Sequence, residues 1–154
     1  MKILVWKTTP LGPLWAGLDA QGRLTTLHWG DAPTSAETSP NHPLQHLLEA
    51  YFSGRTTLTS GIAGHLNLSG TPFQQRVWQA LLQIPQGQTV TYGQLAATLG
   101  THPRALGGAV GANPVAILVP CHRVVGSSGK LTGFSAPGGI TTKKWLLNHE
   151  GVAC

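Results

Sequence analysis

The chain has 154 residues, 41% of them hydrophobic, which is enough for one ordinary domain or two small ones with a real core. No apolar run approaches the roughly 18 residues of a membrane span, and the apolar run near the start is too short for a signal peptide. With only two cysteines, Cys121 and Cys154, a disulfide framework is excluded, and a reducing cytoplasm is the expected location.

Charge is sparse and unevenly distributed. Charged residues make up 10% of the chain, against about 25% in typical globular proteins. Acidic and basic side chains cancel over residues 1–70, whereas residues 71–154 have Glu150 as their only acid and carry the whole net charge of +5. This one-sided positive field favours a polyanionic partner such as nucleic acid, although ordinary solubility charge would have the same sign.

The first 70 residues predict a small antiparallel sheet with one helix. Three runs of β-forming residues indicate strands over 2–8, 13–18 and 24–29. Residues 19–22 are typical of a hairpin turn, and after a Pro/Ser/Thr-rich loop over 31–40, apolar residues at helical spacing predict a helix over 43–52. Residues 61–70 have the composition of a linker, so we place a domain boundary near residue 70.

Residues 71–154 predict a cluster of helices that is typical of DNA-binding proteins. Thr71 as N-cap and Pro72 at the first helical position mark a helix start. A short helix follows over 92–99 and Pro103 begins another, so that two short helices joined by a tight turn indicate a helix-turn-helix. The predicted fold class is α+β, with a small N-terminal antiparallel-sheet domain at 1–70 and a C-terminal winged helix-turn-helix-like domain at 71–154.

The helix that begins near Arg104 is unusually rich in glycine. Gly107, Gly108 and Gly111 each cost about 1 kcal/mol relative to alanine in a helix interior, so small size must be needed on one face. Either another helix packs tightly there, or the face enters a narrow groove of DNA. Few side chains of this helix could read base edges, which argues against sequence-specific binding and against a winged-helix transcriptional regulator.

The tetrapeptide Pro120-Cys121-His122-Arg123 follows an apolar run. A lone thiol beside an imidazole and a guanidinium has neighbours that lower a thiol pKa, although a single buried cysteine is also a common small core residue. Glu150 lies against the dipole of a last helix that is predicted from about Thr141, so it either orients a histidine or belongs to a frayed end. His42 and His46 share a helix face but lack further ligands, so no metal site is predicted.

Several motifs, in one order along nearly the whole chain, resemble the O6-alkylguanine-DNA alkyltransferases, also called methylated-DNA–protein-cysteine methyltransferases. The stretch from Asn113 to Gly126 around Cys121 is similar to the active-site signature of that family. Further matching segments are 9–14, 71–78, 92–96, 104–107 and 144–151. The resemblance implies direct-reversal DNA repair, in which the alkyl group of O6-alkylguanine moves irreversibly and once only to the protein's own cysteine after base flipping, with O4-alkylthymine left open as a second substrate.

The resemblance also implies roles for individual residues. Cys121 would attack the alkyl carbon, with His122 taking the thiol proton through a water and Glu150 orienting that imidazole. Tyr92 would protonate the departing guanine O6, and Asn113 would brace the turn before the active site. The residues implied to bind double-stranded DNA through the minor groove are Arg104, Ala105, Gly107 and Gly108, with Arg104 entering the base stack. The residues implied to wall the pocket of the flipped base are Val124, Phe134 and Ser135.

The implied protein is a monomer that needs no cofactor and no metal. The zinc site of some relatives uses N-terminal cysteines, and this chain has none before Cys121. Phe134 stands where many relatives have tyrosine, and segment 135–139 is longer than in some, so tolerance of bulky alkyl groups stays open. The main rival is a non-enzymatic lesion-binding protein of the same fold, which carries tryptophan in place of the reactive cysteine. A Cys-His hydrolase is a further alternative, which the basic, groove-entering half does not indicate.

Overall fold

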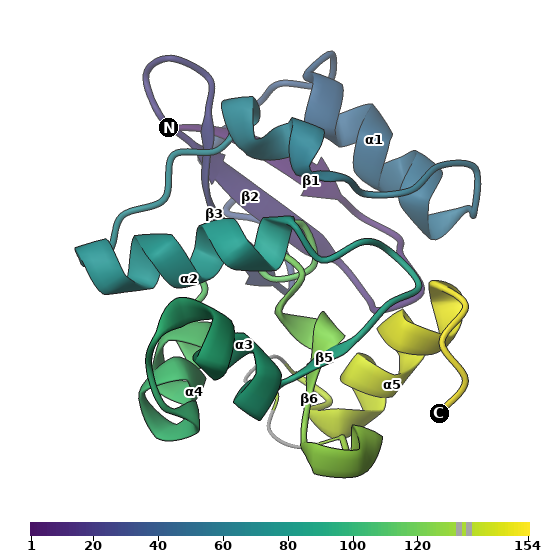
Figure 1. The fold of residues 1–154 in the computed structure, drawn as a ribbon. Coiled ribbons are helices and arrows are strands. Elements are labelled where there is room, and N and C mark those ends of the chain that lie inside the picture. The colour runs from purple at the N-terminus through teal and green to yellow at the C-terminus, as the bar shows by residue number, and fades with distance from the viewer. Residues whose placement is uncertain (132–133, 135–136) are drawn as a thin grey trace. The chain divides into compact units, whose positions relative to one another are not determined.

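The computed structural model describes residues 1–131, 134 and 137–154 and divides into two compact units, Met1–Ser69 and Gly70–Cys154. The first unit contains a sheet and one α-helix, and the second is mainly helical (Figure 1). This arrangement confirms the α+β class that the sequence predicts. No helix within the described ranges is long and apolar enough to cross a membrane.

The sheet of the first unit has the strand order β3-β2-β1-β4. Its strands are β1 (Lys2–Trp6), β2 (Leu14–Leu18), β3 (Leu24–Trp29) and β4 (Glu37–Thr38). The first three are antiparallel as predicted, but β4 pairs with β1 in parallel, so the sheet is mixed. A two-residue strand inside a loop-like sequence has no signal from which it could be predicted. The pairing forms because the backbone N–H groups of Glu37 and Ser39 donate to carbonyl oxygens along the exposed edge of the sheet at β1. Helix α1 (Pro43–Phe52) packs along β1 and buries Leu44 and Leu48 (Figure 1).

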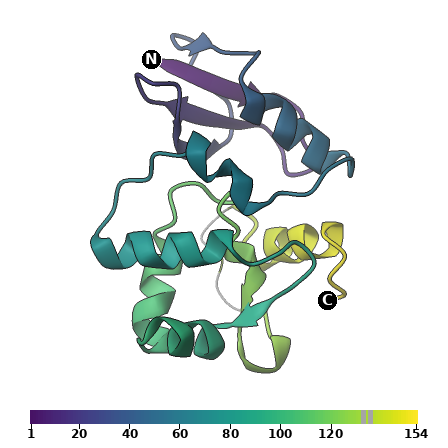
Figure 2. The same cartoon turned by 45° about the horizontal axis from the view of Figure 1, so that its top comes forward.

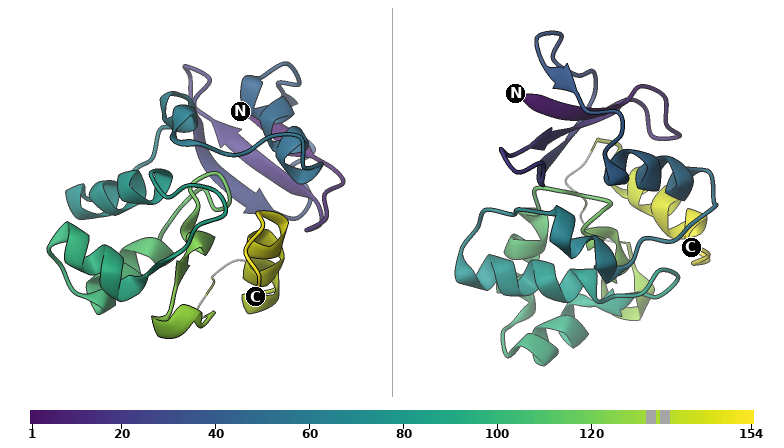
Figure 3. Two further views of the ribbon diagram at one scale, coloured as in Figure 1. Left: turned by 45° about the vertical axis from the view of Figure 1, so that its right-hand side comes forward. Right: turned by 90° about the horizontal axis from the view of Figure 1, so that it is seen from above.

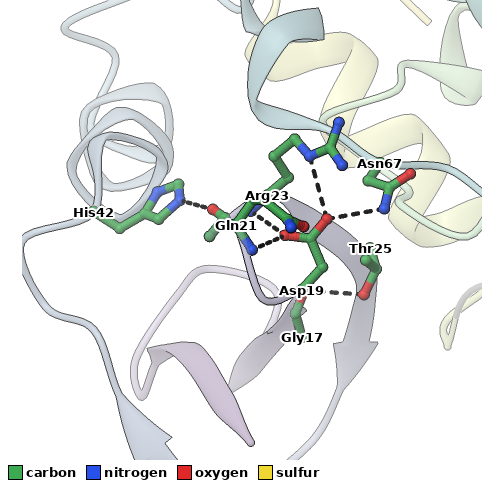
Figure 4. Close-up of polar contacts among 8 residues, drawn as sticks. Gly17, Asp19, Gln21, Arg23, Thr25, His42 and Asn67 are labelled. Carbon is green, nitrogen blue, oxygen red and sulfur yellow. Dashed lines mark hydrogen bonds and ion pairs between the residues drawn. The ribbon is translucent and has the colours of Figure 1, made fainter.

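The turn between β2 and β3 is built around one carboxylate (Figure 4). Asp19 Oδ1 accepts hydrogen bonds from the backbone N–H of Gln21 and Arg23 at 2.9 and 2.8 Å. Its Oδ2 accepts from Arg23 Nε at 3.2 Å and from Asn67 Nδ2 at 2.9 Å. Asn67 N also donates to Leu24 O at 2.9 Å. The predicted hairpin turn therefore also fixes the chain segment that leaves the unit.

The segment predicted as a linker is partly structured. Residues Ser60–His65 form a 3₁₀ helix, η1, which begins at the Thr59 N-cap and buries Ile62. Leu66 then pairs with Leu24 as an isolated bridge. Glycine and small residues at 60–65 resemble a linker in composition, but the buried side chain of Ile62 anchors the segment to its unit.

The second unit groups its helices on the two sides of a short parallel ladder, as Figures 2 and 3 show. Its helices are α2 (Pro72–Leu82), α3 (Tyr92–Leu99), α4 (Pro103–Gly111) and α5 (Ile140–His149), and its ladder is β5 (Val90–Thr91) with β6 (Val124–Val125). Thr71 and Thr91 each form a capping box with a glutamine three residues later, which explains why α2 and α3 begin where they do. Gly100 ends α3 in the left-handed conformation at φ 69°.

Helices α2 and α4 are joined by a buried tryptophan. Trp78 Nε1 donates to Ala109 O at 2.9 Å, which satisfies the indole N–H inside the core. Gly70, just before α2, lies so close to this indole that a Cβ there would be 2.5 Å from a ring carbon. The second unit therefore begins at a position where no larger residue fits without rearrangement.

Candidate active site

The turn that leads to Cys121 is held by Asn113. Asn113 Nδ2 donates to Val119 O at 2.8 Å, and its Oδ1 accepts from Val115 N at 3.0 Å. Inside this turn Ile117 is fully buried with φ 76°, a left-handed conformation that costs a β-branched residue on the order of 1–3 kcal/mol. The asparagine amide thus links the two ends of a strained segment and fixes the position of Cys121.

Cys121, His122 and Arg123 form one turn of 3₁₀ helix, η2. Arg123 N donates to Pro120 O at 3.1 Å to close this turn. In a 3₁₀ helix successive side chains are about 120° apart, so the side chains of Cys121 and His122 do not point to opposite sides. Pro120, at the end of the apolar run, lacks the N–H that a continuing strand would need for its ladder.

Glu150, the C-cap residue of α5, brings His122 and Arg123 together. His122 Nε2 lies 2.8 Å from Glu150 Oε2. Arg123 donates from Nε to Oε1 at 2.9 Å and from Nη2 to Oε2 at 3.1 Å, and its Nη1 reaches Ile84 O at 2.6 Å. The side chains of His122 and Glu150 are 0% exposed and that of Arg123 is 2% exposed. Arg123 and Glu150 thus form a buried bidentate ion pair, to which His122 is hydrogen-bonded. The alternative that Glu150 belongs to a frayed helix end is therefore wrong.

Burial favours the neutral form of the imidazole in this network. Burial is the main cause that lowers the pKa of His122; the carboxylate of Glu150 opposes this, and the positive charges of Arg123 and Lys143 add to it. A carboxylate only accepts, so Nε2 carries the proton and Nδ1 keeps a lone pair. Among the described residues no group hydrogen-bonds that buried Nδ1, which leaves it as a basic nitrogen.

The thiol of Cys121 is 8% exposed, and burial raises its pKa. Hydrogen bonding from Asn113 and the positive charge of Lys143 act in the opposite direction but do not outweigh burial. The expectation of a lowered pKa is therefore wrong for the free protein: burial outweighs the groups that lower the pKa, and the guanidinium of Arg123 pairs with Glu150. The sulfur is held as a thiol and needs a base to become nucleophilic.

Tyr92, the first residue of α3, is half-buried near this thiol. Burial raises its pKa, and negative charge on Cys121 raises it further. Lys143 Nζ lies 5.8 Å from the centre of the Tyr92 ring. Sequence reasoning missed Lys143 as a site residue; the available signal was a lysine in the first turns of α5, where the helix dipole disfavours positive charge.

The glycine face of α4 is open. A Cβ built on Gly107, Gly108 or Gly111 would meet no other atom within 4 Å among the described residues. The alternative that these glycines serve tight helix packing inside the chain is therefore wrong, while Leu106, Ala109 and Val110 on the other face are buried. Arg104 in the first turn is exposed and Ala105 is partly exposed.

The residues predicted to wall a base pocket are only partly described. Val124 is fully buried in β6, and Phe134 is partly exposed. Ser135 lies outside the described residues.

His42, one of two histidines on a shared helix face, uses both ring nitrogens within its own unit. Its Nδ1 accepts from Leu44 N at the start of α1, and its Nε2 is 2.7 Å from Gly22 O (Figure 4). Within the described part of the chain, no three His, Cys, Asp or Glu side chains gather as metal ligands would.

Comparison with known proteins agrees with this geometry. Residues 72–152 match the family model described as 6-O-methylguanine DNA methyltransferase, DNA binding domain. The methylated-DNA–protein-cysteine methyltransferase of Salmonella typhimurium is 45% identical over 161 aligned residues, which cover 93% of this chain and 92% of that protein. The crystal structure of Mycobacterium tuberculosis OGT in complex with DNA is 42% identical with a TM-score of 0.81, covering 97% of this chain and 92% of that one. The O6-methylguanine-DNA methyltransferase of Pyrococcus kodakaraensis, at 28% identity, covers 98% of this chain and 99% of its own with a TM-score of 0.71.

Proposed function

The chain belongs to the methylated-DNA–protein-cysteine methyltransferase family and repairs O6-methylguanine in DNA, and we propose that the sulfur of Cys121 is the atom that accepts the methyl group. One observation carries the proposal. A buried thiol and a buried imidazole are consecutive residues of η2, and the imidazole contacts the carboxylate of Glu150 at the end of α5. This is the arrangement of nucleophile, base and orienting group that activates weak nucleophiles.

The proton leaves the thiol by way of His122. Its Nδ1 takes the thiol proton through a bridging water, and the imidazolium that forms is stabilised by Glu150 at 2.8 Å. Because Arg123 already pairs with that carboxylate, the imidazole is protonated only during the reaction, not in the resting protein. The thiolate then attacks the methyl carbon, so that a carbon–sulfur bond forms as the bond between carbon and guanine O6 breaks.

The departing oxygen takes its proton from Tyr92. The raised pKa of this phenol keeps it protonated at neutral pH, so it is ready to donate. The products are a neutral thioether on Cys121 and an unmodified guanine. The proton that His122 took from the thiol returns through water to the Tyr92 phenolate, so the reaction balances without a cofactor. A thioether has no good leaving group, so each molecule acts once. A free thiol nucleophile also requires reducing surroundings, which is why the cytoplasm is the expected location.

DNA is bound by the second unit through the minor groove. The open glycine face of α4 lets the backbone approach the groove floor, and the exposed Arg104 can fill the space that a flipped base leaves. Ala105, Gly107 and Gly108 line the groove, while Val124, Phe134 and Ser135 wall the base pocket. In this proposal residues 71–154 bind DNA and carry the reaction, residues 1–70 form a separate domain, and the protein acts as a monomer.

Intact-protein mass spectrometry after incubation with DNA carrying one O6-methylguanine tests the acceptor. The expected result is a stoichiometric gain of one methylene in the wild type, mapped to Cys121, and none in Cys121→Ala. A Cys154→Ala variant is the matched control and should gain the methylene like the wild type, because Cys154 lies exposed and far along the chain. Transfer that persists in Cys121→Ala would refute the proposal, and tight binding without transfer in the wild type would favour a lesion-binding protein.

The groove contact has its own test, the substitution Gly108→Ala. Since the new methyl group meets nothing inside the protein, the helix should gain up to about 1 kcal/mol in unfolding free energy. The same methyl group would enter the space between helix and groove floor, so affinity for DNA should fall. Unchanged affinity, measured by fluorescence anisotropy at fixed salt, would place DNA elsewhere.

A further inference from the structure

The turn between α3 and α4 is held by two exposed side chains, one at each of its ends. Arg76 of α2 donates from Nη2 to Leu99 O, at the last residue of α3, at 2.8 Å. His102, the N-cap residue of α4, accepts a hydrogen bond at Nδ1 from Ala105 N at 3.4 Å. Each side chain is therefore anchored to the backbone of the helix-turn-helix by one of its nitrogens.

Both side chains keep further donors beyond these contacts. A guanidinium has five N–H groups, and Arg76 uses one nitrogen of the three at Leu99 O. A backbone N–H only donates, so Nδ1 of His102 is an acceptor and the neutral ring carries its proton on Nε2. Because both residues are exposed, their remaining N–H groups are accessible to a ligand from solution.

Helix capping alone does not account for the choice of these two residues. Gly100, in the left-handed conformation at φ 69°, already ends α3, and asparagine, aspartate, serine or threonine would be the preferred N-cap of α4. The distance of 3.4 Å between Ala105 N and Nδ1 is also long for a hydrogen bond. Arginine and histidine differ from the usual capping side chains in that they reach further and present N–H groups beyond the cap.

The charges near this turn have the same sign, and no exposed acid of their own unit compensates them. Arg104 is exposed like Arg76 and follows two residues after His102. Glu150, the only acid between residues 70 and 154, is buried and paired with Arg123. Positive groups without a nearby carboxylate repel one another in the free protein, and a polyanion relieves that repulsion. The ligand expected at this turn is therefore an anion.

We infer that Arg76 and His102 form a clamp that binds a phosphate of the DNA backbone beside the minor groove. The inference rests on the proposed function, in which the open glycine face of α4 approaches the groove floor. The minor groove is only about 6 Å wide, so the turn that leads into this helix lies against one of the two phosphate backbones. Arg76 then donates to the phosphate from N–H groups that Leu99 O leaves free, and His102 donates from Nε2.

The clamp would act as a positioning device for the reaction. Phosphate contacts carry no sequence information, but they fix the register and orientation of a protein on the duplex. Since Arg76 and His102 are already anchored on the turn, little side-chain freedom is lost when they bind. A phosphate held at this turn would set the depth at which Arg104, in the first turn of α4, reaches the base stack.

The test measures binding of the full chain to an undamaged duplex, which offers no methyl group for transfer, by fluorescence anisotropy between about 50 and 200 mM salt. Arg76→Gln removes the charge, and His102→Asn replaces the imidazole by a shorter side chain that is a preferred N-cap. Arg55→Gln is the matched control, because Arg55 is also exposed and anchored by a hydrogen bond, to Ser53 Oγ at 2.8 Å, but lies in the first unit.

For Arg76→Gln we expect the slope of log affinity against log salt concentration to become shallower by about 0.9, the contribution of one phosphate contact. For His102→Asn we expect affinity to fall about 10-fold at fixed salt, the scale of one hydrogen bond to a charged group. Its midpoint of urea unfolding should not fall, because asparagine caps α4 at least as well. Arg55→Gln should keep the wild-type slope and affinity.

Purely structural caps would give a different pattern. Either an unchanged salt slope in Arg76→Gln or wild-type affinity in His102→Asn would overturn the inference. Arg76→Lys keeps the charge and should keep the wild-type slope, whereas a slope as shallow as that of Arg76→Gln would also count against the clamp. Failure of the proposed function would appear elsewhere, as unchanged DNA affinity in Gly108→Ala or as methyl transfer in Cys121→Ala.

Discussion

Each unit contains one carboxylate paired with an arginine, and the two pairs serve opposite purposes. Asp19 and Arg23 lie in a turn of the first unit with side chains 14% and 46% exposed, and Asp19 accepts two hydrogen bonds from backbone N–H groups and two from side chains (Figure 4). Glu150 and Arg123 in the second unit are 0% and 2% exposed, and Glu150 accepts hydrogen bonds from the buried side chains of His122 and Arg123. The same chemical pair fixes a turn where water reaches it, and organises a reactive imidazole where water is excluded.

The two pairs should differ in how much the free energy of unfolding falls when one partner is removed. An exposed carboxylate that loses its arginine is solvated by water, so little changes. A buried arginine that loses its carboxylate is left as an uncompensated charge, and breaking such a pair typically costs about 3–5 kcal/mol. The contrast between the two pairs can therefore be measured residue by residue.

The largest effect is expected from Glu150→Gln. Without the carboxylate, the charge of buried Arg123 is unpaired, so the free energy of unfolding should fall by about 3–5 kcal/mol, and methyl transfer should slow because the His122 imidazolium loses its partner. Urea unfolding and single-turnover transfer measure the two quantities. Asp19→Asn is the matched substitution in the first unit; if it costs as much stability as Glu150→Gln, burial does not distinguish the pairs.

Arg123→Lys should have the next largest effect. Lysine keeps the charge but cannot hold both oxygens of Glu150 or also reach Ile84 O, so unfolding free energy should fall by about 2–3 kcal/mol. Arg23→Lys in the exposed turn is the control and should unfold at nearly the wild-type urea concentration. Equal midpoints for the two lysine variants would contradict the importance of the two-pronged contact.

Acid should weaken the two networks at different pH. Because the pKa of His122 is lowered on folding, the unfolded chain takes up a proton below about pH 6.5 that the folded chain refuses, so stability falls as pH drops from about 6.5. The pKa of Asp19 is lowered chiefly by the backbone N–H of Arg23, so its contribution is lost only below its ordinary value of 3.8. Urea unfolding between pH 7.5 and 5 should show the first loss, and His122→Asn should flatten that slope. An unchanged slope in this variant would assign the loss to other histidines.

The smallest effect is expected from Asn67→Ala. Removing the amide deletes one of the four hydrogen bonds on Asp19 and loosens the end of the first unit, without touching the buried network. Hydrogen exchange at the backbone N–H of residue 67 should become faster, while methyl transfer keeps its wild-type rate. A slowed transfer would reveal a coupling between the two units that the separate networks do not predict.

Local signals in the sequence identified most elements and the main reactive groups. Apolar periodicity located α1, and the Thr71 N-cap with Pro72 located the start of α2. The oddity of Glu150, an isolated acid placed against its helix dipole, pointed to a histidine partner, and the structure brings the two together.

Other features depend on contacts between distant segments and left no local signal. Strand β4 is two residues long and pairs with the free edge of β1, and the 3₁₀ turn η2 had no signal in the sequence. The sequence predicted a lowered pKa for Cys121, and this direction was wrong. Adjacency in sequence does not reveal that Arg123 pairs with Glu150 or that the thiol is buried. Burial of Lys143 likewise depends on how α5 packs, which its sequence pattern does not specify.

The burial of Glu150 also shapes how the second unit moves on DNA. It is the only acidic side chain between residues 70 and 154, and its carboxylate is fully covered, so no side-chain carboxylate of this unit faces solvent. A DNA phosphate close to this unit meets only positive or neutral side chains, and we expect this to let the protein stay loosely attached while it slides and hops between base pairs. A scarce lesion could then be found by scanning along one duplex instead of by repeated collisions from solution.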